Sequence, residues 1–514
     1  MTQSLGKRNT PVSGPKGGVA SPAVAPGFVE LTPKVVTVDP VTRIEGHLKI
    51  EVKVDHVGGE LKVVDAWSTG TLFRGIEQIL VNRHPWDAVP ITQRVCGVCP
   101  VSHGMAAVKT IDAASNVNPP DNGRILRNFV LGANYVASHM LHFYHLALLD
   151  FVEGPPMAPW EPGWKSDLRV DGPTSQTFVN HYLTALEMRR KAHEAGAVFG
   201  GRLPAPPAYI PGGFTAIPKS ADITKVGAYL NELIPFIQNV WIPDIQLLGT
   251  YYTDYYNIGQ GPANLLAYGV FDEDATGQNK LLRRGRVENG STSVQPVDVN
   301  AITEDVTWSW YAGSTNGLPP ATGQTSPKYP KGNAYSWLKS PRYSGKPYEV
   351  GPLARMWVNG DYRNGISVMD RHMARALEAL KVAQAMQTWI GQIAIGQPVY
   401  TNHKVPETGS GYGLTEAPRG ALGHWLDISS KKISRYQIVT PTCWNASPRD
   451  AGGVQGPIEQ ALMGTPVASF KEPVGLLRVV HSFDPCLSCA VHVMRPDDKA
   501  RVVVRSRFGS SPVR

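Results

Sequence analysis

The sequence has little cysteine for its length, with only five cysteines in 514 residues. Five cysteines in so long a chain do not make a disulfide scaffold of the kind that staples small secreted domains. The 51 glycines and 43 prolines exceed average usage, but they are too few for a disordered low-complexity chain. With 42% hydrophobic residues, the chain is expected to fold around a large core and to carry long irregular loops.

The main body of the chain also lacks excess positive charge, although the formal net charge of the whole sequence is +8. The excess is concentrated at the two ends, because residues 493–514 carry +4 and residues 1–30 carry +2. A surface that binds nucleic acid needs clustered Lys and Arg side chains. The charge distribution therefore argues against nucleic acid as a partner.

No segment reads as a membrane span or as a secretory signal. Residues 128–149 contain no Asp, Glu, Lys or Arg, but three histidines are spread along them, which favours a helix buried inside the protein over one in lipid. Residues 1–30 have neither a continuous apolar core nor a twin arginine. We expect these first 30 residues to form a flexible arm.

Hydrophobic periodicity predicts several elements of the fold. Apolar and polar residues alternate from Leu48 to Asp55 and are followed by Gly58-Gly59, a pattern that indicates a β-hairpin. Between residues 252 and 348 the composition is typical of short strands and loops packed on a helical body. Helical patterns cover a short segment and two long ones, residues 76–82, 121–151 and 365–394.

Four of the five cysteines form two pairs of the same spacing, Cys96-Gly-Val-Cys99 and Cys486-Leu-Ser-Cys489, each followed by a histidine. Such a pair places two thiolates on one turn of backbone, where both can bind a single soft metal ion. Zinc ribbons keep their two pairs within tens of residues, whereas about 390 residues separate these. A four-sulfur metal centre is favoured, and structural zinc and disulfide exchange stay open as alternatives.

The segments around the cysteines, residues 94–103 and 484–492, resemble the two signature motifs of nickel-iron hydrogenase large subunits. The resemblance is to the respiratory uptake type and extends from about residue 35 to His492. It implies a mainly α fold with peripheral β-structure (α+β), built around a long central helix bundle. Further segments resemble the family in the family's order: Arg43-Ile-Glu45-Gly-His47, Leu72–Glu77, His142-Phe-Tyr-His145, Glu349–Arg355, Glu416–Gly420 and Tyr436–Asn445.

The resemblance also implies a domain organisation. Residues 31–492 would form the catalytic domain, preceded by the arm of residues 1–30. Residues 493–514 would be a C-terminal extension that a maturation endopeptidase removes after His492, once nickel is loaded.

The resemblance implies that Cys96, Cys99, Cys486 and Cys489 bind nickel. Of these, Cys99 and Cys489 would bridge to an iron that carries carbon monoxide and cyanide. Thiolates are soft ligands that suit such a centre. The substrate implied is H2, which this family oxidises to protons and electrons.

The resemblance assigns further residues to the chemistry of this centre. Heterolytic cleavage of H2 needs a hydride acceptor and a base close together. The family assigns the base to the Cys486 thiolate and the next proton carrier to Glu45. By the same resemblance, the remaining side chains would lie around the metals: Arg419 would bond one cyanide, Pro441 and Thr442 would line the other, and His103 would bond a bridging sulfur.

The resemblance also implies a second metal site. Glu77, the carbonyl of Ile438 and His492 match the family positions that hold a magnesium ion. Carboxylate and carbonyl oxygens are ordinary magnesium ligands, whereas histidine is an unusual one.

The cysteine count indicates that a partner chain carries the electrons. Once four cysteines are assigned, only Cys443 remains, and one thiol cannot ligate an iron-sulfur cluster of the usual four-cysteine type. The resemblance implies an iron-sulfur small subunit in a heterodimer or higher oligomer, which passes electrons to a quinone or cytochrome b. It further implies attachment to a membrane through partner subunits on the periplasmic or extracytoplasmic face, and a cytoplasmic location stays open.

Two departures from the family pattern bear on activity and on the response to oxygen. Many relatives have His-Asp-His where this chain has Ala137-Ser138-His139, so a carboxylate expected near Arg419 is missing. Cys443 replaces a common threonine. Two alternatives remain: a quinone-site subunit like that of respiratory complex I, which shares the fold without the nickel ligands, and a structural zinc protein with four thiolate ligands.

Overall fold

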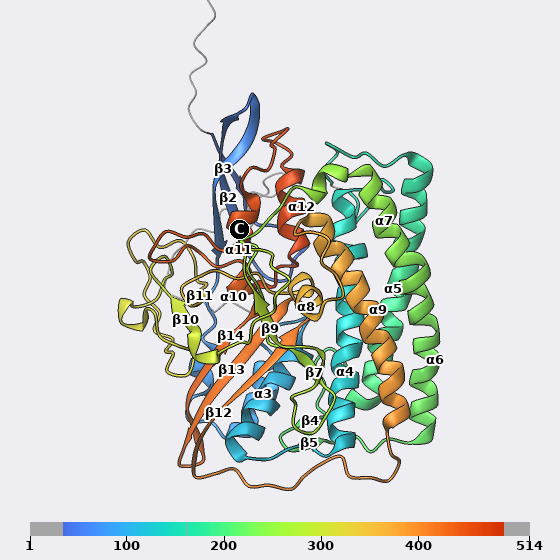
Figure 1. Ribbon diagram of the computed structural model, residues 1–514, viewed down its shortest axis with the longest axis vertical. Helices are drawn as coiled ribbons and strands as arrows, with labels where there is room; N and C mark the ends of the chain where they lie inside the picture. Colours follow the sequence, from blue (N-terminus) through green and yellow to red (C-terminus); the bar gives the residue numbers. More distant parts are fainter. Residues whose placement is uncertain (1–33, 162, 488–514) are drawn as a thin grey trace, which may run out of the picture.

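Long helices form a bundle along one side of the molecule, and sheets with shorter helices form the other side (Figure 1). The computed structural model describes residues 34–161 and 163–487. Helix α4 packs against α5 and α9, and α6 packs against both α5 and α9. The four helices of the bundle are α4 (Asp121–Met140), α5 (Gly172–Gly200), α6 (Ser220–Phe236) and α9 (Val368–Gln392).

Helix α4 is the buried centre of this bundle, as the run without Asp, Glu, Lys or Arg predicts. Nearly every side chain from Asn122 to Met140 is buried, because α5 and α9 cover it on two sides. The helix continues as a π-helical segment, Leu141–Ala147, and a short 3₁₀ turn, Leu148–Asp150, so the predicted end near residue 151 is confirmed. Within the described residues, no helix has the length and apolarity to cross a bilayer.

An antiparallel sheet, β1-β2-β3, contains the predicted hairpin. Its strands are β1 (Lys34–Val38), β2 (Leu48–Val57) and β3 (Glu60–Gly70). The buried side chains of β2 alternate with half-buried ones along the strand, as the period-two pattern requires. Gly58 and Gly59 form the turn with φ of 62° and 86°, a backbone conformation that glycine adopts at no steric cost.

A second antiparallel sheet, β12-β13-β14, supports helix α3. The strands are β12 (Thr408–Ala417), β13 (Gly420–Ser429) and β14 (Lys432–Val439), and α3 spans Pro100–Ser115. Glycines in β12 let the helix lie directly on the strand, since a Cβ at Gly411 would come within 2.5 Å of the Thr110 carbonyl oxygen. This close contact holds the middle of α3, the helix whose first residue follows Cys99.

The remaining elements are short and connect these layers. Between α7 and α8, short strands and loops cover residues 252–348 as predicted, and the predicted short helix after the hairpin is α1. The helices are α1 (Ile76–Leu80), α2 (Ala88–Thr92), α7 (Ile242–Tyr251), α8 (Pro352–Asn359), α10 (Pro441–Asn445), α11 (Pro457–Leu462) and α12 (Val474–Ser482). The strands are β4 (Tyr209–Ile210), β5 (Gly213–Phe214), β6 (Leu265–Ala267), β7 (Val270–Asp272), β8 (Lys280–Leu282), β9 (Gly285–Val287), β10 (Ile302–Asp305) and β11 (Ser340–Tyr343).

The architecture confirms the predicted fold class, a long helix bundle with peripheral β-structure. The two ends of the described chain meet in it, because Glu45 and Cys486 form an isolated parallel β-bridge. The C-terminal segment after α12 therefore lies against the loop that precedes β2. The boundaries of the N-terminal arm and of the C-terminal extension lie outside the described residues.

Candidate metal centre

The fold brings the first and last cysteine motifs into one buried cluster. Cys96 and Cys99 lie in the loop between α2 and α3, and Cys99 is the residue directly before the first turn of α3. Cys486 follows α12, after a turn in which Asp484 has a φ of 55°. The thiol sulfurs of Cys96, Cys99 and Cys486 all lie within 4.8 Å of one another, and all three residues are buried.

The spacing of these sulfurs fits a shared metal ion. The Sγ atoms of Cys96 and Cys486 are 3.1 Å apart, which is too long for a disulfide bond of about 2.05 Å. Two thiolates that each lie about 2.3 Å from one metal ion must be within about 4.6 Å of each other. Backbone N–H groups of Val98 and Cys99 both donate to Cys96 Sγ at 3.2 Å and so stabilise its thiolate form. The fourth predicted ligand, Cys489, lies outside the described residues.

Glu45 joins the two cysteine motifs. Its Oε2 lies 3.8 Å from Cys486 Sγ, and its Oε1 accepts a hydrogen bond of 3.3 Å from the backbone N–H of Gly97. Its own carbonyl accepts a hydrogen bond of 2.6 Å from the N–H of Leu487. The half-buried carboxylate is thus placed where it can exchange a proton with the Cys486 thiol.

Arg419 lies at the tip of the β12–β13 hairpin and is buried. Ala417 pairs with Gly420, so Pro418 and Arg419 form a two-residue turn that points toward the cysteines. The guanidinium pairs with Asp484 at 2.9 Å and donates to Ser138 Oγ at 3.4 Å. Burial alone would lower its pKa, but the negative groups around it, Asp484, Cys486, Cys99 and Cys96, raise the pKa well above the usual value for arginine.

Two residues that contact Arg419 bear on the aspartate that this chain lacks relative to the family pattern. Ser138 occupies the position that the sequence comparison with the family leaves without a carboxylate, and it contacts the same guanidinium. Asp484, two residues before Cys486, supplies the ion pair. Sequence analysis missed Asp484 as a site residue, and its place inside the second cysteine motif was the available signal.

His103 lies in the first turns of α3 and is fully buried. Burial lowers its pKa to about 4, so the imidazole is neutral at physiological pH. Its Nδ1 is 3.2 Å from Nε2 of His424, whose Nδ1 is 2.8 Å from the Tyr436 hydroxyl. Within residues 34–161 and 163–487, Nε2 of His103 has no hydrogen-bond partner. His424, which contacts the Nδ1 side of the His103 ring, and Tyr436, which contacts His424, were not identified as site residues from the sequence.

Thr442, one of the two residues predicted to line the second cyanide, contacts Cys486, and the other, Pro441, precedes it in the chain. Pro441 opens the short helix α10, and Thr442 is buried in its first turn. The Thr442 hydroxyl accepts a hydrogen bond of 3.0 Å from the backbone N–H of Cys486. This bond fixes the backbone that carries the Cys486 thiol.

The structure also brings together two of the three residues predicted to bind magnesium. Oε1 of the buried Glu77 accepts a hydrogen bond of 2.8 Å from the backbone N–H of Ile438, and Oε2 accepts one from the Thr325 hydroxyl. A second buried carboxylate, Glu304, lies nearby; burial raises its pKa above the usual value, Lys339 opposes this shift, and Glu77 adds to it. The third predicted ligand, His492, lies outside the described residues.

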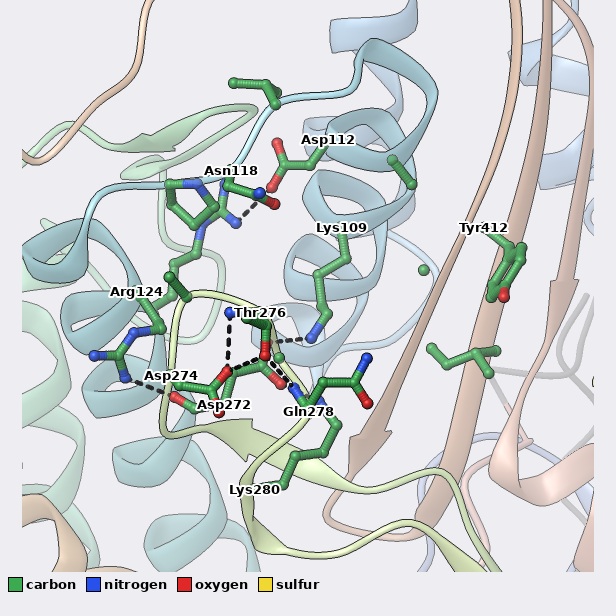
Figure 2. Close-up of a pocket in the computed structure, with 18 of the residues that line it drawn as sticks. Lys109, Asp112, Asn118, Arg124, Asp272, Asp274, Thr276, Gln278, Lys280 and Tyr412 are labelled. Atoms are coloured by element: carbon green, nitrogen blue, oxygen red, sulfur yellow. Dashed lines mark hydrogen bonds and ion pairs between the residues drawn. The ribbon is translucent and has the colours of Figure 1, made fainter. Parts of the chain in front are cut away.

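A separate pocket of about 380 Å³ lies at the surface between α3, α4 and the β7–β8 segment (Figure 2). Its charged groups are paired within the protein, since Lys109 and Lys280 both contact Asp272, and Arg127 donates to Asp112 at 2.6 Å. It holds none of the residues predicted to bind metal. The residues predicted from the sequence to bind metal therefore lie outside this pocket.

Known proteins that resemble this chain over nearly its whole length are nickel-dependent hydrogenases. The family model described as nickel-dependent hydrogenase matches residues 74–161, 155–366 and 358–492, and a model described as HoxL-like matches residues 35–65. The chain is 42% identical to the periplasmic NiFeSe hydrogenase large subunit of Desulfomicrobium baculatum, over 91% of this chain and 97% of that relative. It is 34% identical to the uptake hydrogenase large subunit of Bradyrhizobium diazoefficiens, over 92% and 98%.

Solved structures are equally similar. A structure of the H2-activated NiFeSe hydrogenase from the same Desulfomicrobium species matches with a TM-score of 0.86 and 43% identity, over 90% of this chain and 100% of that one. The reduced NiFe-Se hydrogenase from D. vulgaris Hildenborough matches with a TM-score of 0.86 and 41% identity, with the same coverage. This chain has cysteine at all four positions of its two cysteine pairs.

Proposed function

The chain belongs to the nickel-dependent hydrogenases as a catalytic large subunit, and on this premise we propose that it works as an uptake enzyme, oxidising H2 to protons and electrons. The observation that carries the proposal is the buried cluster of Cys96, Cys99 and Cys486, drawn from opposite ends of the chain beside Glu45 and Arg419. The relatives support neither the quinone-site subunit nor the structural zinc protein. The uptake direction follows the relatives that are named uptake hydrogenases.

Four thiolates would hold the nickel-iron centre. Cys96 and Cys486 are proposed as the terminal nickel ligands, and Cys99 and Cys489 as the ligands that bridge to an iron carrying carbon monoxide and cyanide. When bound, this centre supplies the electron-accepting site at which H2 is split. The convergence of three buried sulfurs within 4.8 Å supports this ligand set.

Cys486 and Glu45 are proposed to move the proton. The Cys486 thiolate takes a proton released from H2, and Glu45 Oε2, 3.8 Å away, receives it next. Because Glu45 is half-buried, its carboxylate lies between the dry cluster and more exposed parts of the protein. The hydrogen bond from Gly97 N–H to Glu45 Oε1 holds the other carboxylate oxygen in place.

Arg419 is proposed to orient and stabilise rather than to transfer protons. Its guanidinium is permanently charged and is paired with Asp484, so it presents fixed N–H donors toward the centre, where one would bond a cyanide. Pro441 and Thr442 would line the second cyanide. The neutral His103 would donate from Nε2 to a bridging sulfur, with His424 holding its other ring nitrogen.

A magnesium ion is proposed at Glu77, the Ile438 carbonyl and His492. Two buried carboxylates, Glu77 and Glu304, share this region with one lysine, Lys339, whose Nζ is 3.3 Å from Glu304. The excess negative charge supports a bound cation there. The proposed domain organisation is an arm of residues 1–30, a catalytic domain of residues 31–492, and residues 493–514 as an extension that a maturation endopeptidase removes.

The large subunit needs a partner for its electrons. A hydrogenase large subunit pairs with a small subunit, and we propose that this one carries iron-sulfur clusters, in a heterodimer or a higher oligomer, and passes electrons on to a quinone or cytochrome b. The D. baculatum relative is named periplasmic, which supports an extracytoplasmic location. We propose attachment to the membrane through the partner subunits.

Infrared spectroscopy combined with elemental analysis of the purified two-subunit enzyme tests the proposal. We expect absorption bands of metal-bound carbon monoxide and cyanide, together with nickel and with iron in excess of nickel, because the iron-sulfur clusters of the small subunit add to the iron of this centre. Zinc without nickel, or the absence of those bands from protein that is active with H2, would contradict the proposed centre. The uptake direction is tested by comparing the rate of H2 oxidation with the rate of H2 production in the same preparation.

A further inference from the structure

Arg355, on helix α8, is completely buried, and its side chain donates five hydrogen bonds. Nε and Nη2 donate to the two carboxylate oxygens of Glu378, both at 2.6 Å, and Nη1 donates to Glu416 Oε2 at 2.8 Å. The two remaining bonds go to backbone carbonyls, those of Ala417 at 2.9 Å and Pro418 at 2.8 Å. Every N–H group of the guanidinium is thus occupied.

The two carbonyls belong to the tip of the β12–β13 hairpin. Ala417 is the last residue of β12, and Pro418 is the first residue of the two-residue turn that ends with Arg419. Arg355 therefore holds the backbone directly before Arg419. Within residues 34–161 and 163–487, no other side chain donates a hydrogen bond to these two carbonyls.

The carboxylates tie this contact to the helix bundle. Glu378 lies on α9 and also bonds Nε2 of His139 on α4 at 2.7 Å. Glu416, at the end of β12, accepts a further hydrogen bond of 2.5 Å from the backbone N–H of Tyr268. The Arg355 guanidinium thus connects the hairpin tip to α8, which carries Arg355, to α9 through Glu378, and to α4 through the bond between Glu378 and His139.

The charges in this cluster are balanced although it is dry. Burial would raise the pKa of Glu378, but Arg355 and His139 lower it to about 2, so this carboxylate is ionised. Burial lowers the pKa of His139 to about 4 and raises that of Glu416 to about 7. One arginine and one fully ionised glutamate form the core of the cluster, so a lysine in place of Arg355 would keep its charge balance.

We propose that Arg355 is a positioning residue for the hydrogenase reaction: through the Ala417 and Pro418 carbonyls it sets where the Arg419 guanidinium lies relative to Asp484 and Cys486. The inference rests on the proposed function only in assigning Arg419 to the metal centre. A lysine cannot replace the five-donor guanidinium of Arg355. Its single ammonium has three donors and cannot reach two carboxylates and two carbonyls together.

Arg355→Lys in the complete two-subunit enzyme tests the proposal, with infrared spectroscopy as the readout. We expect the variant to retain nickel and iron, to shift or broaden the cyanide bands, and to turn over about 10- to 100-fold more slowly, since small displacements at a reacting centre have effects of this size. Arg342→Lys is the matched control. Arg342 is buried and donates five hydrogen bonds, including ones to the Pro448 and Val454 carbonyls, and none of these five bonds goes to the β12–β13 hairpin.

A double-mutant cycle separates positioning from a general structural role. If Arg355 acts through Arg419, adding Arg355→Lys to an Arg419→Lys enzyme causes little further change in turnover or in the cyanide bands. Equal effects of Arg355→Lys in both backgrounds, or cyanide bands identical to those of the wild type, overturn the proposal. If Arg355→Lys does not fold, Glu416→Gln takes its place, with a smaller band shift expected and an unchanged spectrum contradicting the proposal.

Failure of this inference differs from failure of the proposed function. If the wild-type enzyme shows no cyanide bands, both the proposed function and the positioning role of Arg355 are wrong. A wild-type enzyme with these bands and an Arg355→Lys variant with the same spectrum removes only the positioning role.

Discussion

The Sγ atoms of Cys96 and Cys486 lie 3.1 Å apart, although 390 residues separate these cysteines along the chain. The contact is made by the parallel bridge between Glu45 and Cys486 on one side and by the packing of α3 on β12 on the other. Neither motif can bind the complete centre alone. Metal binding is therefore expected to depend on the finished fold, unlike that of a local zinc site.

Replacing a cysteine of the cluster should remove the metal. Cys96→Ser and Cys486→Ser each exchange a soft thiolate for a hydroxyl that is a poor ligand at neutral pH, so we expect loss of most nickel and of H2 oxidation. Nickel content by mass spectrometry of the purified enzyme is the measurement. Cys443→Ser is the control, since Cys443 lies outside the cluster and its sulfur contacts the Thr440 hydroxyl at 3.4 Å. Full nickel content in Cys486→Ser would contradict the proposed ligand set.

Glu45→Gln should slow proton transfer and leave the metal in place. The amide keeps the size of the carboxylate and can still accept from the Gly97 N–H, but it cannot carry a proton from the Cys486 thiol. We expect turnover to fall by about 10²- to 10⁴-fold with nickel and iron unchanged. Exchange of deuterium between D2 and water measures the proton step directly. Glu51→Gln, on β2 and in an ion pair with Lys49 at 2.7 Å, controls for loss of a carboxylate, and equal rates in both variants would exclude Glu45 from proton transfer.

The C-terminus of the active enzyme should be His492. The proposed cleavage removes residues 493–514, whose net charge is +4. Intact-mass spectrometry of the active large subunit should therefore give the mass of a chain that ends at His492. An active species that keeps Arg514 would show that no such processing is needed.

Local sequence patterns predicted the elements that are regular and the motifs that bind metal. The alternating residues of β2 and the uncharged run of α4 define their burial without any knowledge of neighbours. Strand β12 is different. It begins Thr408-Gly-Ser-Gly-Tyr-Gly, and glycine is depleted in strands, so no local pattern indicated it. Its glycines are explained only by the helix that lies on them, which is a tertiary fact.

The same limit applies to the site. The cysteine spacing identified Cys96, Cys99 and Cys486 because two thiols three residues apart are chemically distinctive. Asp484 and Arg355 are single charged residues, which are usually exposed, and only the fold shows that both are buried and paired around Arg419. The family resemblance named the residues that we propose surround the metals, whereas identifying the groups that contact those residues required the structure.

Asp272→Asn should destabilise the wall of the pocket in Figure 2. Asp272 contacts the ammonium groups of both Lys109 and Lys280, and the variant leaves two neighbouring positive charges without a carboxylate. We expect a loss of about 1–3 kcal/mol in the free energy of unfolding, measured by chemical denaturation and reduced at high salt because salt screens the repulsion. Asp274→Asn is the control, since Asp274 accepts hydrogen bonds only within its own turn, from Thr276 and Asn279. An equal loss in both variants would exclude the lysine pair as the cause.

The stability of the Glu459→Gln variant, relative to that of the wild type, should increase as pH rises. Burial raises the pKa of Glu459 to about 8, although it accepts hydrogen bonds of 2.8 Å from the Ser68 N–H and the Tyr335 hydroxyl. The folded protein therefore holds a proton that the unfolded chain releases near its usual pKa of about 4.5. The stability that this proton contributes is complete below that value and is lost as pH rises toward 8, by up to about 1.4 kcal/mol per pH unit.

Glutamine is neutral at every pH and does not have this dependence. The unfolding temperature of Glu459→Gln, measured relative to wild type by calorimetry between pH 5.5 and pH 8.5, is therefore expected to rise up to about pH 8 and to level off above it. Glu407→Gln, at an exposed position beside Lys431, is the control for removal of a surface carboxylate. A difference between Glu459→Gln and wild type that stays constant across this range would mean that Glu459 is already ionised in the folded protein. In that case its buried carboxylate must be compensated by a positive group, for which Arg449 is the nearest candidate.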